Sequence, residues 1–205
     1  MSRIALIGDS HSQALWPKVS KLLQSEGHTV VLTEANAGWS EAKYLSSGSL
    51  AAKLSAARPD IVVFELGGNN QKMKAADYLA DVDQLVRMAK NAGAAHILYV
   101  GPATATEVVT SARHETSADI LAASIPSMGV TWLDSRPLTL SGQRSDGVHF
   151  NDAAYTSWAK AITDKIVRTA KAFDPVWLWA ALSVSVAALA VAGAFRYRRS
   201  VALHS

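Results

Sequence analysis

The stretch Ile4-Ala5-Leu6-Ile7-Gly8-Asp9-Ser10-His11 decides the fold of this chain. Its first four residues are apolar, as in a buried strand, and Gly8 and Asp9 interrupt the run. From Gln13 onward, apolar residues recur with helical spacing. Ser10 is therefore expected at a sharp strand-to-helix turn, at the carboxyl edge of a sheet. The first turn of a helix favours developing negative charge, and open α/β folds place their chemistry at this edge.

Strands and helices are expected to alternate five times along the chain. Residues 61–66 form the most continuously apolar run, which is typical of a central parallel strand covered on both faces. Further strands are predicted at 28–33, 96–100 and 130–133, and further helices at 41–57, 75–92, 117–124 and 151–172, with 103–117 left unassigned. Asn151 is a suitable N-cap for the last helix. This order predicts a three-layer α/β/α sandwich on a mostly parallel five-stranded sheet.

The composition limits the chemistry that this chain can perform. Its 205 residues contain no cysteine, which excludes disulfides, thiolate metal sites and cysteine nucleophiles. The formal charge is only +3, and the basic residues gather near the C-terminus, so nucleic-acid binding has little support. No His, Asp or Glu grouping has the spacing of metal ligands, so we expect neither a metal nor another cofactor.

The last part of the chain differs from the rest. Residues 175–195 carry no charge, and a helix of this length spans about 30 Å, the thickness of a bilayer core. Trp177, Trp179 and Tyr197 flank the run as interfacial aromatic residues do. We therefore expect an α/β domain over residues 1–173, a transmembrane helix over 174–196 and a short basic tail over 197–205. An unusually apolar core helix is the alternative.

The side of the membrane that carries the domain stays open. Arg196, Arg198 and Arg199 favour a cytoplasmic C-terminus, but Lys165, Arg168 and Lys171 on the other flank nearly cancel that bias. No signal-peptide core precedes Ser10, so we expect the mature protein to keep its N-terminus. A cytoplasmic domain with a single-pass C-terminal anchor requires the fewest assumptions. Delivery by another route, including a viral particle, is the alternative, and the oligomeric state is open.

A second polar motif, Asp146-Gly147-Val148-His149, precedes the last predicted helix. Across a glycine-containing turn, Asp146 can accept a hydrogen bond from His149, fix its tautomer and stabilise it when it becomes charged. A serine such as Ser10 is a weak nucleophile until a base of this kind takes its proton. The chain thus contains the trio of an activated serine in the order Ser, Asp, His.

These motifs together resemble the SGNH hydrolase superfamily, the GDSL-type esterases. Gly8-Asp9-Ser10 matches the first block of the superfamily, Gly38 the second, Gly67-Gly68-Asn69 the third and Asp146-Gly147-Val148-His149 the last. Asn70 departs from the aspartate that ends the third block. The resemblance covers residues 3–172, and four blocks in order on the expected elements make it specific. It implies a flavodoxin-like sheet.

The resemblance also implies a role for each matching residue. Ser10 would be the nucleophile, His149 the general base and Asp146 the residue that orients His149. The backbone N–H groups of Ser10 and Gly38 and the side-chain amide of Asn69 would form the oxyanion hole. Glycine at position 38 would let the backbone approach the substrate closely, and Asn69 would supply a neutral donor.

Several residues near these motifs could either contact the substrate or serve the packing of the fold. His11, Trp39 and Asn70 are candidates for the substrate pocket, but His11 and Trp39 fit ordinary packing as well. Asp9 is expected to hold the turn through backbone hydrogen bonds. His114 is expected in a turn or loop.

The sequence predicts a serine esterase that forms an acyl-Ser10 intermediate, with small acyl groups such as acetyl on carbohydrate as the expected substrates. The chain has no long insertion that could form a lid over a large lipid. A non-catalytic module of the same fold, fixed to a membrane or a viral assembly, is one alternative. An O-acyltransferase acting on a sugar hydroxyl is the other.

Overall fold

The computed structural model describes residues 1–71 and 74–172. The chain divides into two units, Met1–Val167 and Arg168–Ser205, and the fold below is that of the first. Within the described ranges, no helix is both long and apolar enough to cross a membrane. The predicted span over 174–196 and the tail over 197–205 lie outside the described residues.

Five strands form one parallel sheet in the order β2-β1-β3-β4-β5. The strands are β1 (Arg3–Gly8), β2 (Thr29–Ala35), β3 (Ile61–Glu65), β4 (His96–Val100) and β5 (Thr131–Leu133). The direction of winding reverses between β1 and β3, which is where open sheets of this kind bind ligands. The predicted parallel five-stranded sheet is confirmed.

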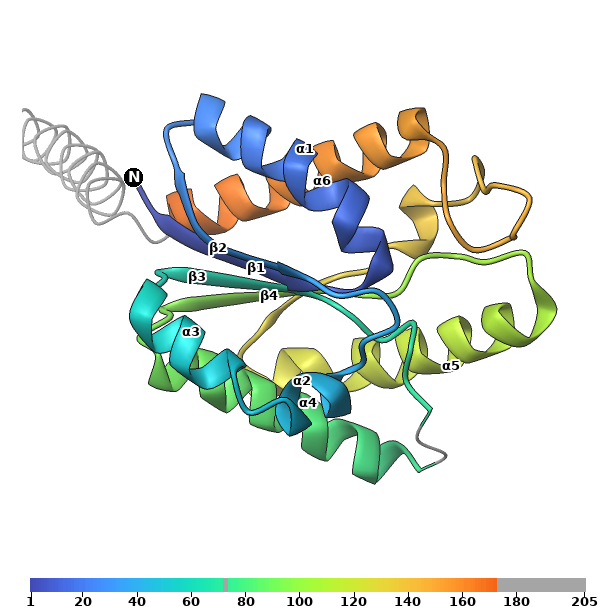
Figure 1. Ribbon diagram of the computed structural model, residues 1–205, viewed down its shortest axis with the longest axis horizontal. Coiled ribbons are helices and arrows are strands. Elements are labelled where there is room, and N and C mark those ends of the chain that lie inside the picture. The colour runs from blue at the N-terminus through green and yellow to red at the C-terminus, as the bar shows by residue number, and fades with distance from the viewer. Residues whose placement is uncertain (72–73, 173–205) are drawn as a thin grey trace, which may run out of the picture. The chain divides into compact units, whose positions relative to one another are not determined.

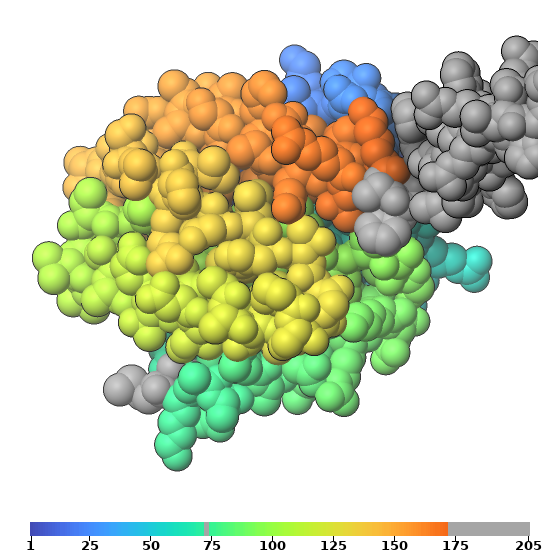
Figure 2. Space-filling view, turned by 180° about the vertical axis from the view of Figure 1, so that it is seen from behind, coloured from blue at the N-terminus to red at the C-terminus, as the bar shows by residue number. Residues whose placement is uncertain are grey.

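Helices cover both faces of the sheet, as Figure 1 shows. They are α1 (Ser10–Ser25), α2 (Glu41–Ser46), α3 (Leu50–Ala57), α4 (Ala75–Asn91), α5 (Val108–Ser124) and α6 (Asp152–Ala172), with short 3-10 turns η1 (Ile125–Met128) and η2 (Arg136–Leu138). α1 and α6 lie on one face and α2 to α5 on the other. In the reverse view of Figure 2, the yellow segment that contains η1, β5 and η2 lies between α4 below and the orange residues above.

The core follows from the alternation of side chains along the strands. Ala5 and Ile7 of β1 point to one face, where they join a buried cluster with residues of α3 and α4. Ile4 and Leu6 point to the opposite face and are equally buried. Because both faces of β1 and β3 are covered, residues 4–7 and 61–64 are apolar, and the polar residues Arg3 and Glu65 stand at strand ends.

Two predicted helices differ from the structure. The single helix expected over 41–57 is broken into α2 and α3, because Gly48 adopts a left-handed backbone with φ of +68°. α5 begins nine residues earlier than predicted, since the Glu107 side chain caps it by accepting hydrogen bonds from the N–H groups of Val109 and Thr110. The predicted cap of α6 is confirmed: Asn151 Oδ1 accepts from the N–H of Ala154 at 3.0 Å.

Candidate active site

Ser10 is the first residue of α1 and follows the end of β1. The end of β1 and the start of α1 lie on the right-hand side of the sheet in Figure 1. Asp9 caps the helix, and its Oδ1 accepts a hydrogen bond from the N–H of His11 at 2.9 Å. The N–H of Ser10 belongs to the first turn, whose donors have no acceptor within the helix. The predicted strand-to-helix turn and the predicted capping by Asp9 are both present.

The structure brings the three predicted triad residues together. His149 Nε2 lies 3.0 Å from Ser10 Oγ, and His149 Nδ1 lies 2.9 Å from Asp146 Oδ2. When Nδ1 carries the proton and donates it to Asp146, Nε2 is free to accept the hydroxyl proton of Ser10. This is the relation between nucleophile, base and orienting group that activates a serine.

Asp146 is held as a carboxylate by its own turn. Its Oδ1 accepts the backbone N–H groups of Val148 and His149, each at 2.9 Å. These backbone bonds, that of Val148 first, together with the His149 ring, hold the pKa of Asp146 well below its usual range. A carboxylate fixed in this way also fixes the orientation of the imidazole.

The loop that carries Asp146 and His149 is anchored at two places. The N–H of Arg144 donates to the carbonyl of His149 at 2.6 Å, and Gln143 pairs with Phe150 in an antiparallel bridge. The carbonyl of Gly147 accepts the N–H groups of Thr106 and Glu107, at 2.7 and 3.3 Å, just before α5. The base is therefore positioned by the connection between β4 and α5 as well as by its own loop.

Gly38 lies in the turn after β2, which is tied to the end of β1. The N–H of Asn36 and the hydroxyl of Tyr44 both donate to the carbonyl of Gly8, at 3.1 and 2.7 Å. Gly38 has φ of +73°, and a Cβ added there would meet no atom within 4 Å. The left-handed backbone requires glycine here, and the close approach to a substrate stays a prediction.

Asn69 connects three loops at the carboxyl edge of the sheet. Its Nδ2 donates to Asp9 Oδ2 at 2.9 Å and to the carbonyl of Trp39 at 3.3 Å. The amide therefore joins the Ser10 turn, the Gly38 turn and the loop after β3. The predicted oxyanion donors stand beside the nucleophile turn, and their role in catalysis stays a prediction.

The GDSL-like lipase/acylhydrolase family model matches residues 6–156, and this match includes all four motifs. The chain belongs to this family. It is accordingly an ester-hydrolysing enzyme. A search of curated proteins found no match.

Solved structures share the fold at low sequence identity. A catalytic mutant of an acetylxylan esterase from Geobacillus stearothermophilus is 15% identical with a TM-score of 0.67, over 80% of this chain and 94% of that chain. A lipase/acylhydrolase from Enterococcus faecalis is 17% identical with a TM-score of 0.62, over 81% and 95%. The periplasmic domain of a lipopolysaccharide acetyltransferase from Salmonella is 11% identical with a TM-score of 0.63, over 80% and 83%.

A cavity of about 280 Å³ lies beside the Gly38 and Asn69 loops of this family member. Trp39 lines it from a half-buried position, edge-on against Tyr44 with ring centroids 4.9 Å apart. Asn70 lines it too, and its Nδ2 lies 3.5 Å from Ser117 Oγ of α5. The remaining lining residues are mostly polar: Gly38, Ser40, Glu41, Ala42, Lys43, Asn69, Gln71 and Asp81.

His11 has a different position from the other two pocket candidates. It is only 2% exposed, its Nδ1 lies 3.1 Å from the hydroxyl of Tyr155, and its ring packs against Phe150 and Trp158. The ring centroids of His11 and His149 are 5.3 Å apart. Burial lowers the pKa of His11 to about 3, so it stays neutral beside the base. The residues that line the cavity do not include it.

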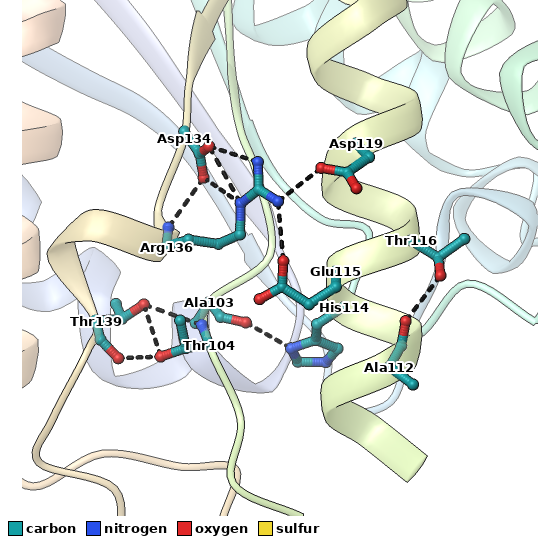
Figure 3. Close-up of polar contacts among 10 residues, drawn as sticks. All are labelled: Ala103, Thr104, Ala112, His114, Glu115, Thr116, Asp119, Asp134, Arg136 and Thr139. Atoms are coloured by element: carbon teal, nitrogen blue, oxygen red, sulfur yellow. Dashed lines mark hydrogen bonds and ion pairs between the residues drawn. The ribbon is translucent and has the colours of Figure 1, made fainter. Parts of the chain in front are cut away.

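Two buried residues next to the site were missed by sequence reasoning. His114 lies within α5, not in a loop, and its Nδ1 is 2.7 Å from the carbonyl of Ala103 (Figure 3). A Cβ added at Gly68 would come within 2.9 Å of His114 Nε2, so His114 supports the loop that carries Asn69. Glu65 ends β3 and is 1% exposed. A charged residue inside the otherwise apolar run 61–66 was the available signal.

Among the described residues, no cluster of three His, Asp or Glu side chains is placed to hold a metal ion. The chemistry of the site can be described with the side chains and backbone groups named above.

Proposed function

We propose that this enzyme is a serine esterase that hydrolyses small acyl esters, such as acetyl groups on carbohydrate, through an acyl-Ser10 intermediate. The observation that carries the proposal is the continuous hydrogen-bonded line from Ser10 Oγ through His149 to Asp146, with distances of 3.0 and 2.9 Å. A line of this geometry gives the serine a base and gives the base an orienting carboxylate.

The reaction follows from these positions. Ser10 Oγ attacks the ester carbonyl carbon while His149 Nε2 takes the hydroxyl proton. The carbonyl oxygen becomes an oxyanion, which the N–H groups of Ser10 and Gly38 and the amide of Asn69 stabilise. The bond to the leaving alcohol breaks, and that oxygen receives the proton from His149. Water then attacks the acyl-serine with the same base, which releases the acid and restores Ser10.

The cavity beside Gly38 and Asn69 supports a small substrate group. Its lining contains two of the predicted oxyanion residues but neither Ser10 nor His149, and its volume of about 280 Å³ suits a small group next to the reacting ester. Lys43, Gln71 and Asp81 on its wall suit hydroxyl-bearing groups more than hydrocarbon. The acetylxylan esterase among the structures of similar fold agrees with an acetylated carbohydrate.

The proposal is tested with Ser10→Ala in the full-length chain. We expect covalent labelling of the wild type by a fluorophosphonate probe, and hydrolysis of p-nitrophenyl esters that falls as the acyl chain lengthens from acetate to laurate. Ser10→Ala should lose the labelling and at least about 10³-fold in kcat/KM. Ser25→Ala, at the exposed far end of the same helix, is the matched control and should keep both.

An unlabelled wild type would instead support the non-catalytic module of the same fold. Undiminished activity in pure Ser10→Ala would assign the reaction to another residue. An O-acyltransferase, suggested by the acetyltransferase domain of similar fold, would yield an acylated acceptor when a sugar is added to the assay. Product analysis with and without a sugar acceptor separates transfer from hydrolysis.

We also propose that residues 175–195 anchor the enzyme in a lipid bilayer as a single-pass span. Support comes from the uncharged sequence with Trp177 and Trp179 at one end and Arg198 and Arg199 beyond the other. Protease accessibility of the Ser10 domain in sealed vesicles would show which side carries it. Release of the full-length chain by carbonate washing would contradict the anchor.

A further inference from the structure

Two buried carboxyl groups face each other directly beneath the nucleophile turn. Asp9 follows β1 and Glu65 ends β3, where Gly8 and Glu65 are paired in the register of the two strands. Each side chain is 1% exposed. The register sets the two side chains side by side, and each carboxyl group perturbs the pKa of the other. They occupy the position between β1 and β3 where the winding of the sheet reverses.

The partners of this carboxyl pair belong to the proposed catalytic machinery. Asp9 accepts the N–H of His11 through Oδ1 and the amide of Asn69 through Oδ2, both at 2.9 Å. Glu65 Oε2 accepts the hydroxyl of Ser12 at 2.7 Å. The carboxyl pair therefore lies between the Ser12 hydroxyl of α1 and the predicted oxyanion donor Asn69.

This arrangement requires one proton between the two carboxyl groups. Two carboxylates in contact and out of water cannot both be ionised without a large penalty. Asp9 accepts two N–H groups, so the negative charge is better placed there, and the proton remains on Glu65. Burial raises the pKa of Asp9 to about 7 and raises the pKa of Glu65 well above its ordinary value.

We propose that Glu65 is a positioning residue: it keeps the proton of the pair, so that the charge stays on Asp9 and fixes the amide of Asn69. The inference rests on the proposed function, in which Asn69 donates to the oxyanion. The Asn69 amide has two N–H groups. Asp9 holds one of them, while the longer bond of 3.3 Å to the Trp39 carbonyl is the one that a substrate oxygen would replace.

The other titratable groups near Asp9 have different partners or different roles from the Asp9 carboxylate, which holds the Asn69 amide. Burial lowers the pKa values of His11 of α1 and His114 of α5. Burial raises the pKa of Glu41 of α2, whose carboxyl accepts from the hydroxyls of Tyr78 and Tyr99. The hydroxyls of Tyr44 and Tyr155 have pKa values raised to about 12 by burial. His149, in the loop before α6, gains and loses its proton in the reaction itself.

The charge on Asp9 should make the activity depend on pH. As the pH falls through about 7, Asp9 takes up a proton, the charge that holds Asn69 disappears, and activity declines on the acid side. In Glu65→Gln, the glutamine amide donates to Asp9 as the protonated Glu65 does, and its oxygen still accepts from Ser12, so the acid limb should keep its position. Glu65→Leu offers no donor, so the Asp9 carboxylate is destabilised and the acid limb should move to higher pH by about one unit or more.

The experiment measures kcat/KM for p-nitrophenyl acetate against pH in the full-length wild type, Glu65→Gln and Glu65→Leu. Glu65→Gln is the matched control, because it keeps a neutral donor toward Asp9 and an acceptor for Ser12. We expect the limb to stay in place in Glu65→Gln and to move to higher pH in Glu65→Leu. The side-chain amide resonances of Asn69 in ¹⁵N NMR spectra should titrate with the wild-type limb and move with it in Glu65→Leu.

A second variant separates positioning from folding. Glu65→Leu removes both the proton and the bond, and should lower kcat about 10- to 100-fold with KM nearly unchanged, since an oxyanion donor acts in the transition state. If Glu65→Leu does not fold, Glu65→Gln still decides, because a limb that moves in Glu65→Gln would place the charge on Glu65 and overturn the inference. An unmoved limb in Glu65→Leu, or Asn69 resonances that ignore pH, would overturn it as well. Loss of the proposed function is recognised separately, as a wild type without labelling at Ser10.

Discussion

Gly38 has φ of +73° and open space where a side chain would point. Gly38→Ala therefore acts through backbone strain alone, which costs about 1 kcal/mol. We expect the free energy of unfolding to fall by about this amount and kcat for p-nitrophenyl acetate to fall about 10-fold or more, because the strained turn displaces one oxyanion donor. Urea unfolding and steady-state kinetics measure the two effects.

Gly48→Ala is the matched control for this change. Gly48 has φ of +68°, an added Cβ there would also meet nothing within 4 Å, and it lies between α2 and α3 instead of in the oxyanion turn. It should lose similar stability without the loss in kcat. Equal losses of activity in the two variants would speak against an oxyanion donor at Gly38.

The triad residues could be predicted because each lies in a short motif whose residue types indicate its catalytic role. Ser10 follows a strand-ending glycine, and Asp146 and His149 are close enough in sequence to meet across one turn. Glu65 and His114 could not be predicted in the same way. Each acts through a neighbour that is distant in sequence, Asp9 for Glu65 and Gly68 for His114, and only the sheet register and the packing of α5 bring those neighbours together.

Among the elements, α5 is held to the end of the sheet by one arginine. Arg136 of η2 binds Asp134, two residues before it, and both Glu115 and Asp119 of α5, with distances of 2.7 to 2.9 Å (Figure 3). The guanidinium lies among three carboxylates, and the Arg136 side chain is 23% exposed. A network of this kind is worth more than an isolated surface pair.

We expect Arg136→Met to lower the free energy of unfolding by about 1–2 kcal/mol near neutral pH. The hydrogen bonds from Arg136 lower the pKa of Asp134 in the folded state. The stabilisation is therefore present above the unfolded value, about pH 4, and is lost as the pH falls below it. Urea unfolding at pH 7 and pH 3 should show a difference that shrinks at the lower pH.

Arg87→Met is the comparison for Arg136→Met. Arg87 pairs with Asp83 on the surface of α4 and its side chain is 72% exposed, so its loss should change stability by no more than about 0.5 kcal/mol. A similar loss in both variants would mean that the network around Arg136 adds nothing beyond an exposed pair.

Element boundaries were predictable where periodicity is strong and not where a side chain sets the boundary. α4 and the three inner strands β1, β3 and β4 follow their apolar patterns closely. The start of α5 was predicted too late for two reasons. Its first turn carries the exposed Val108 and Val109, so the apolar residues there do not mark a buried helical face, and the helix begins where the Glu107 side chain caps it. The break between α2 and α3 depends on one left-handed glycine within a helical composition.

For the molecule as a whole, two buried groups oppose each other in the pH dependence of folding. His11 stays neutral in the folded state down to about pH 3, but in the unfolded chain it gains a proton near pH 6.5, so acid weakens the fold through His11. Asp9 behaves in the opposite way. It is protonated in the folded state below about pH 7 and in the unfolded chain only near pH 4, so acid strengthens the fold through Asp9 in that interval.

His11→Gln should therefore alter the pH dependence of the free energy of unfolding. Between pH 7.5 and 4.5 the variant should gain about 2 kcal/mol relative to the change in the wild type, because the uptake of a proton by the unfolded chain is removed. Urea titrations of both full-length proteins at the two pH values give this difference. His96→Gln, at a half-buried histidine, should show a much smaller one; equal differences would contradict the assignment to His11.

The layered architecture could be predicted from the alternation of strands and helices, because only a few topologies satisfy right-handed crossovers. The order β2-β1-β3-β4-β5 is the consequence that matters for the site, since it sets β1 and β3 side by side and brings Ser10 and Asn69 to one edge. Their hydrogen-bonded neighbours depend on side-chain rotamers, which periodicity does not encode.

The contact of the Gly147 carbonyl with the N–H groups of Thr106 and Glu107 bears on how segments of such enzymes can be exchanged. A chimaera that receives only residues 142–151 from a relative would carry the acid–base pair without the backbone donors that seat it. Grafts should therefore include residues 103–107 as well. In this enzyme, two loops that lie about forty residues apart in the sequence must be transferred together to keep His149 in position.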